Sequence, residues 1–144
     1  VYVGNISGRL AALDLGSGER KWVARDGAIG PVAPAGDSVF AVTDLNELVR
    51  LDAATGRRVW GTPLPNFVKD KPKKQSEVVA HYGPIIAGGR VIVASNDGLL
   101  RSFDPVSGAL TGTTEIPGGA TTAPVVANGT LYVVSAKGKL HAFR

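Results

Sequence analysis

The fold of this chain is decided by residues 1–22, which read VYVGNISGRLAALDLGSGERKW. The same order of residue types returns at residues 39–60, 91–112 and 131–144, so the copies begin 38, 52 and 40 residues apart. Short strands repeated at a spacing near 40 residues are typical of a β-propeller. The sequence therefore predicts an all-β fold made of four-stranded antiparallel blades, as a propeller fragment with WD40-like repeats.

The repeats divide the chain into four units. Turn residues and apolar runs place the units at 1–29, 30–82, 83–120 and 121–144, with a long insertion loop at 63–82. The second unit shows the whole pattern, with strands predicted over 30–34, 38–43, 48–51 and 57–61. Counting strands in this way predicts three, four, four and three strands, or about 3.5 blades.

Aspartate and glycine recur at one place in the first three units, and tryptophan in the first two. An aspartate stands four residues before a glycine, and in two units a tryptophan follows four residues after it. Aspartate accepts backbone N–H groups in an Asx-turn, glycine takes a positive φ, and a tryptophan ring can pack between blades. We interpret these as structural repeat positions rather than a carboxylate cluster or a ligand-stacking site: Asp14, Gly18, Trp22, Asp52, Gly56, Trp60, Asp104 and Gly108. Gly112 occupies the third tryptophan position, which predicts a weaker contact there.

Composition excludes several kinds of chemistry. The 144 residues include no cysteine, so disulfides, thiolate nucleophiles and cysteine-bound metals are ruled out. The two histidines, His81 and His141, do not have the spacing of metal ligands. No apolar run reaches the length of a membrane-spanning helix. We therefore expect no catalytic residue, cofactor or metal, and no enzymatic activity.

A basic segment lies in the long loop. The net charge is +4, and the positive residues concentrate at Lys69, Lys71, Lys73 and Lys74, close to Phe67. A nucleic-acid surface would need a broader basic face with aromatic residues for stacking, so nucleic acid is not an expected partner. These five residues form a candidate partner loop; the alternative is a solvated insertion that varies in length between relatives.

Three segments carry a resemblance to a known family. They are Leu10–Asp14, the stretch from Gly83-Pro84-Ile85 to Asp104, and Thr121–Arg144. Residues 1–22 resemble the PQQ-type propeller repeat, and the three segments resemble more closely the C-terminal half of the BamB family. That resemblance implies part of an eight-bladed ring, held by a lipid anchor upstream of this segment at the periplasmic face of the bacterial outer membrane. It also implies a non-catalytic scaffold for β-barrel protein assembly, with a POTRA domain of BamA as protein partner.

Two other functions remain open from the sequence. One is a fragment of a PQQ-dependent quinoprotein dehydrogenase, whose site needs a calcium-binding set of side chains and often vicinal cysteines. The other is a sensor or interaction propeller joined to a further domain. A partial ring also exposes unpaired strand edges, so we expect possible self-association of the fragment.

Overall fold

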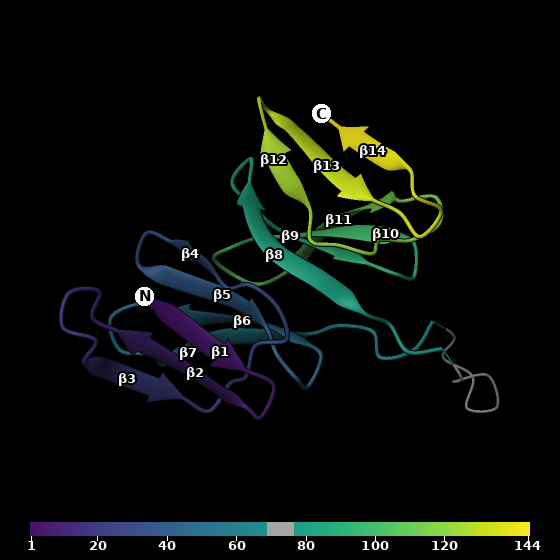
Figure 1. The fold of residues 1–144 in the computed structure, drawn as a ribbon. Coiled ribbons are helices and arrows are strands. Elements are labelled where there is room, and N and C mark those ends of the chain that lie inside the picture. The colour runs from purple at the N-terminus through teal and green to yellow at the C-terminus, as the bar shows by residue number, and fades with distance from the viewer. Residues whose placement is uncertain (69–76) are drawn as a thin grey trace.

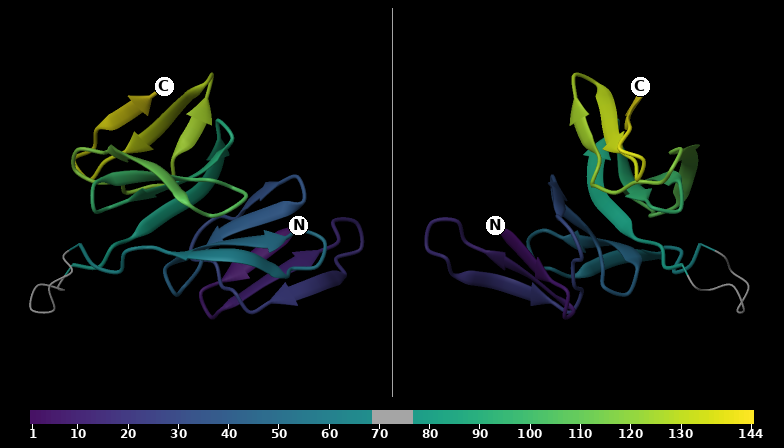
Figure 2. Two further views of the ribbon diagram at one scale, coloured as in Figure 1. Left: turned by 180° about the vertical axis from the view of Figure 1, so that it is seen from behind. Right: turned by 45° about the vertical axis from the view of Figure 1, so that its right-hand side comes forward.

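The fold is described from a computed structural model, which covers residues 1–68 and 77–144. Fourteen strands form four antiparallel sheets, and the described residues contain no helix. The sheets follow one another in chain order, and residues 64–68 and 77–80, between β7 and β8, project away from them (Figures 1 and 2). Three, four, four and three strands make up the sheets, which confirms the predicted all-β propeller-type class.

Each sheet is a simple meander in which consecutive strands pair. The first sheet contains β1 (Tyr2–Asn5), β2 (Arg9–Leu13) and β3 (Arg20–Ala24). The second contains β4 (Ala33–Ala35), β5 (Ser38–Val42), β6 (Glu47–Asp52) and β7 (Arg58–Pro63). The third contains β8 (His81–Ala87), β9 (Arg90–Ser95), β10 (Leu99–Phe103) and β11 (Leu110–Glu115), and the fourth β12 (Val125–Ala127), β13 (Thr130–Val134) and β14 (Leu140–Phe143).

The strands predicted over 38–43, 48–51 and 57–61 have bounds shifted by one or two residues, and β4 and β8 differ from the expectation in more informative ways. The ladder of β4 covers only Ala33–Ala35, although a strand was predicted over 30–34. Pro31 and Pro34 both lack an N–H, so this edge segment has few donors for a ladder and pairs over three residues only. Strand β8 starts at His81, two residues inside the predicted loop 63–82, because His81 and Tyr82 pair with Ser95 and Ala94. The connection between strands therefore spans residues 64–80.

The core lies between sheets rather than within one. We call the face of a sheet that is turned to the following sheet its C-side face, and the opposite face its N-side face. In the second, third and fourth sheets the N-side face packs against the preceding sheet. Side chains alternate between the two faces along each strand. Three buried apolar clusters join the sheets in chain order: first to second, second to third, and third to fourth. Each cluster pairs a C-side face with the next N-side face, so stability depends on stacking neighbours.

Candidate interaction surface

The repeated aspartates lie in three similar turns on separate sheets. Asp14 Oδ1 accepts the N–H groups of Gly16 and Ser17 at 2.9 and 3.0 Å. Asp52 and Asp104 accept the corresponding N–H groups two and three residues ahead of them, at 2.7 to 3.1 Å. The pKa of all three carboxyl groups is lowered, at Asp52 first by a hydrogen bond from the hydroxyl of Thr55 and at Asp14 and Asp104 first by these backbone bonds, because each bond stabilises the charged form. The aspartates therefore do not converge on one site, and one oxygen of each is used within its own turn.

The glycines of two of these turns hold the tryptophans of the preceding sheet. Gly56 and Gly108 have φ of 72° and 74°, and a side chain there would meet the ring of Trp22 or Trp60 respectively. Trp22 Nε1 donates to the carbonyl of Ala53 at 2.9 Å, and Trp60 Nε1 to that of Pro105 at 3.1 Å. Each indole thus supplies both apolar contact and a hydrogen bond across a sheet-to-sheet boundary.

The third boundary lacks a tryptophan. A side chain at Gly112 would meet nothing within 4 Å. Ile116 and Ala120, at 1% and 0% exposure, pack with Leu131 and Val133 of the fourth sheet in its place. The contact between the third and fourth sheets therefore uses aliphatic side chains that follow β11 in the chain.

Residues 64–68 and 77–80 leave the stack side by side, and we call these two segments the arm. The N–H of Val68 donates to the carbonyl of Glu77 at 3.0 Å, and Phe67 forms a bridge with Val78. Leu64 and Val79 are buried at the base of the arm, whereas Val68 and Val78 are exposed. Of the candidate partner loop, Phe67 is half-buried on this arm. Lys69, Lys71, Lys73 and Lys74 lie outside the described residues.

A buried polar network anchors the arm to the third sheet. His81 Nδ1 lies 2.7 Å from Ser95 Oγ, and Nε2 lies 2.9 Å from the carbonyl oxygen of Pro65. That carbonyl can only accept, so Nε2 carries the proton and Nδ1 accepts the hydroxyl proton of Ser95. Arg101 donates to Ser95 Oγ at 3.0 Å and forms an ion pair with Asp97, both side chains being 9% exposed. Sequence reasoning missed this network, because its side chains come from three strands and a turn.

The network is a structural contact rather than a hydrolytic site. Ser95 is fully buried, so its hydroxyl oxygen is out of reach of a substrate. The Ser95 hydroxyl oxygen also accepts a hydrogen bond from Arg101. His81 Nε2 donates to the main-chain carbonyl of Pro65, so it is not available to a substrate. Among the described residues, no group of three or more His, Asp or Glu side chains is arranged to hold a metal ion.

We expect this network to make stability depend on pH. Burial, with the nearby positive charge of Arg101, lowers the pKa of His81 below its ordinary value of 6.5. The unfolded chain then binds a proton that the folded chain does not, so stability falls as the pH drops below about 6.5. Thermal unfolding at pH 7.5 and 5.5 measures the loss.

The matched variant for this prediction is His81→Gln, which cannot be protonated in this range. Its melting temperature should change less between the two pH values than that of the unaltered protein, whatever its absolute stability. His141 is present in both proteins and cancels from the comparison. An equal pH dependence in both proteins would contradict the assignment to His81.

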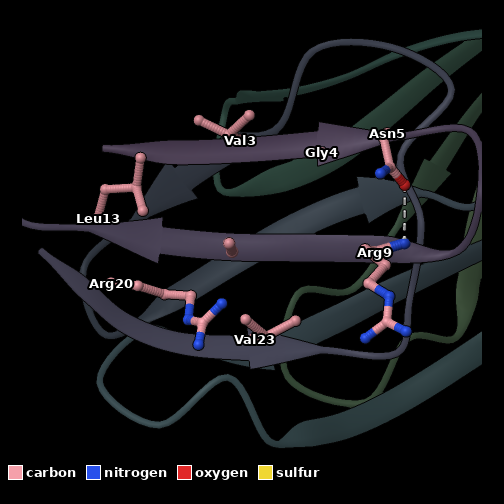
Figure 3. A pocket seen from close by; sticks show the side chains of 8 residues that line it. Val3, Gly4, Asn5, Arg9, Leu13, Arg20 and Val23 are labelled. Carbon is pink, nitrogen blue, oxygen red and sulfur yellow. Dashed lines mark hydrogen bonds between the residues drawn. The ribbon is translucent and has the colours of Figure 1, made fainter. Parts of the chain in front are cut away.

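The N-side face of the first sheet forms an open groove. Val3, Ala11, Leu13 and Val23 lie on this face, which encloses about 690 Å³ together with Arg9 and Arg20 (Figure 3). Neither arginine forms an ion pair within the described part of the chain. The alternation of apolar residues in β2 and β3 can be read from the sequence. It does not show which face of the sheet packs against another sheet.

No helix among residues 1–68 and 77–144 has the length and apolarity needed to cross a membrane.

Comparison with known proteins identifies the family. The family model described as outer membrane protein assembly factor BamB matches residues 1–62 and 68–144. The BamB of Alkalilimnicola ehrlichii is 30% identical over 146 aligned positions, which cover 99% of this chain and 35% of that protein. The BamB of Yersinia pestis is 27% identical over 107 positions, covering 74% of this chain and 27% of that protein.

A solved structure agrees with the fold. The crystal structure of BamB from Moraxella catarrhalis superposes with a TM-score of 0.75 at 24% identity, over 99% of this chain and 42% of that one. The chain thus spans about a third of the length of the curated relatives it matches. Since the family model covers nearly every residue, the chain belongs to the BamB family of outer membrane protein assembly factors.

Proposed function

We propose that this chain is part of a scaffold subunit of the machinery that assembles β-barrel proteins in the bacterial outer membrane. The observation that carries this proposal is the family match over residues 1–62 and 68–144. It favours an assembly role over a fragment of a quinoprotein dehydrogenase or a sensor propeller. The proposed location is the periplasmic face of the outer membrane, where such a subunit meets its clients.

The geometry supports a binding role rather than catalysis. The repeated aspartates accept N–H groups within their own turns, and the tryptophans donate hydrogen bonds to carbonyls across the boundary between sheets. Arg58 adds an ionic contact between the first two sheets. Its guanidinium forms ion pairs with Asp26, which follows the first sheet, and with Glu47 of its own sheet. The repeat positions Asp14, Asp52 and Asp104 therefore serve, in our proposal, to build a rigid stack that presents loops.

The proposed partner is a POTRA domain of a BamA-type subunit. The test is retention of the full-length parent protein on an immobilised POTRA region, measured by pull-down and by biolayer interferometry. We expect saturable binding, because a scaffold subunit must hold its partner without chemical turnover. A full-length parent that is folded but shows no retention would contradict the partner assignment.

The arm supplies a second, local test. Val68 and Glu77 already face each other, so residues 69–76 can be replaced by Asn-Gly, which forms a two-residue hairpin turn. If the arm is a partner surface, this shortened parent should bind the POTRA region less tightly while keeping its melting temperature. Unchanged binding would identify the arm as a solvated insertion and leave the partner to other loops.

A further inference from the structure

The boundary between the second and third sheets contains a small pocket. Its second-sheet wall includes Phe40 and Arg50, and its third-sheet wall includes Ile86 and Val106. Each of these two sheets packs against another sheet on both of its faces. The pocket volume is about 180 Å³, comparable to the ~150 Å³ cavity that holds benzene in another protein. It therefore has room for one ring or a short branched chain.

The walls of this pocket are largely apolar and carry a single charge. Phe40 is buried and is supported by Trp60, whose ring lies 5.9 Å away. Ile86 is half-buried, and Val106 is 72% exposed, which places it at the rim. Arg50 is the one charged residue among those that line the pocket. A ligand here would thus meet apolar surface on most sides and one guanidinium.

Arg50 stands where the neighbouring sheets have uncharged residues. It pairs across the ladder with Trp60, and the residues in the same register of the first and third sheets are Ala12 and Ser102. A charge on a face that stacks against the next sheet loses hydration, which costs free energy unless an opposite charge pairs with it. The charge is therefore a feature of this boundary and is not required by the repeat.

Within the described residues, Arg50 is incompletely neutralised. Its side chain is 19% exposed, whereas its carboxylate partner Asp37 is 86% exposed and lies 3.5 Å from Nη2. The buried arginine of the third sheet differs, because Arg101 lies 2.5 Å from Asp97, which is as buried as Arg101 itself. Arg50 thus keeps charge for a further anion in a place shielded from water, where attraction between charges is stronger.

The guanidinium of Arg50 is held in position and still has donors to offer. Nε donates to Ser38 Oγ at 2.9 Å, and Nη1 donates to the carbonyl oxygen of Pro105 at 3.4 Å. With the long contact from Nη2 to Asp37, three of the five N–H groups have acceptors among the described residues. The other two, one on each terminal nitrogen, can meet the two oxygens of a carboxylate.

We propose that this pocket binds a monocarboxylate with a compact apolar body, such as a single ring or a short branched chain. The body packs on Phe40 and Ile86, and the carboxylate pairs with Arg50. Asp37 gives way, because its side chain is exposed and its contact is long. A free organic acid and the C-terminal residue of a polypeptide share this chemistry. The site is separate from the assembly role proposed above and does not depend on it.

Ligand-observed NMR on the full-length parent protein tests the site, with benzoate as the probe and benzamide as its neutral match. Benzoate should bind with a dissociation constant of about 1 mM. Benzamide should bind at least about tenfold more weakly, because it keeps the ring and loses the charge-assisted pair. The tripeptide N-acetyl-Gly-Gly-Leu tests the second source of the carboxylate. Tighter binding of benzoate identifies a free acid as the ligand, and tighter binding of the tripeptide identifies a chain terminus.

Four variants of the parent protein locate the binding. Arg50→Gln removes the charge and Val106→Glu adds a carboxylate at the rim, so each should weaken benzoate binding at least about tenfold. Asp37→Asn removes the competing carboxylate and should tighten binding by about two- to fivefold. Arg57→Gln changes an exposed arginine outside the pocket and should bind benzoate normally.

Thermal melting shows which variants fold. If Arg50→Gln is unstable, Val106→Glu and Asp37→Asn still decide the outcome, because both positions are exposed. Equal binding of benzoate and benzamide, benzoate binding unchanged by Val106→Glu, or no binding of either carboxylate at about 10 mM would each overturn the proposal.

Discussion

Replacement of Trp22 by alanine is expected to lower the free energy of unfolding by about 3–5 kcal/mol. The side chain is 8% exposed and packs between the first and second sheets, where its ring contacts Gly56 and lies 5.8 Å from the ring of Tyr2. Alanine would leave a cavity there and would also leave the carbonyl of Ala53 without its donor. Urea unfolding followed by circular dichroism measures the loss.

Two further variants separate the parts of this effect. Trp22→Phe keeps an aromatic ring but removes the indole N–H, so its loss should be smaller than that of Trp22→Ala. Val59→Ala truncates a side chain on β7 that is 53% exposed, and it should change stability by less than about 0.5 kcal/mol. If Trp22→Ala behaved like Val59→Ala, the indole would not be holding the two sheets together.

The second large effect is expected from Gly56→Ala compared with Gly18→Ala. Both glycines have a positive φ, 72° and 74°, which costs any other residue about 1–2 kcal/mol. At Gly56 the added Cβ would also lie 2.6 Å from Trp22 Cδ2, whereas at Gly18 it would meet nothing within 4 Å. Gly56→Ala should therefore be less stable than Gly18→Ala by about 1–3 kcal/mol, the usual cost of overpacking.

This pair of variants isolates the contact between sheets from the backbone strain, because the two turns share one conformation. Chemical unfolding of both proteins under the same conditions gives the difference. Gly108→Ala provides a replicate, since its Cβ would lie 2.7 Å from Trp60 Cε3. Equal losses at Gly18 and Gly56 would show that the tryptophan moves aside without cost. A larger loss at Gly18 would contradict the packing described here.

Local structure was largely readable from the sequence. The residues that form each turn lie within a few positions of one another. An aspartate whose side chain can accept the N–H groups two and three residues ahead strongly favours an Asx-turn. The strand counts in the four sheets also follow from the turns, because each hairpin needs its own reversal. The eight-bladed ring stays a prediction, since four sheets do not determine how many complete the circle.

Boundaries and buried polar groups were harder to predict. The short β4 and the early start of β8 depend on which residues find a partner across the sheet, and periodicity does not carry that information. The network of His81, Ser95 and Arg101 joins residues 6 and 14 positions apart. Nothing in the local pattern marks His81 as buried, because its burial comes from the base of the arm.

By itself, the sequence determined the repeat, the turns within it and the two positions where an indole faces a neighbouring sheet, because each of these depends on residues a few positions apart. The tertiary structure alone decided which faces are covered. Trp22 reaches a carbonyl 31 residues away, and Ala12 is buried against the second sheet whereas Ala11, its neighbour in the strand, is only half-buried. Alternation along a strand defines two faces, but only packing against another sheet distinguishes a buried face from one that is free to bind.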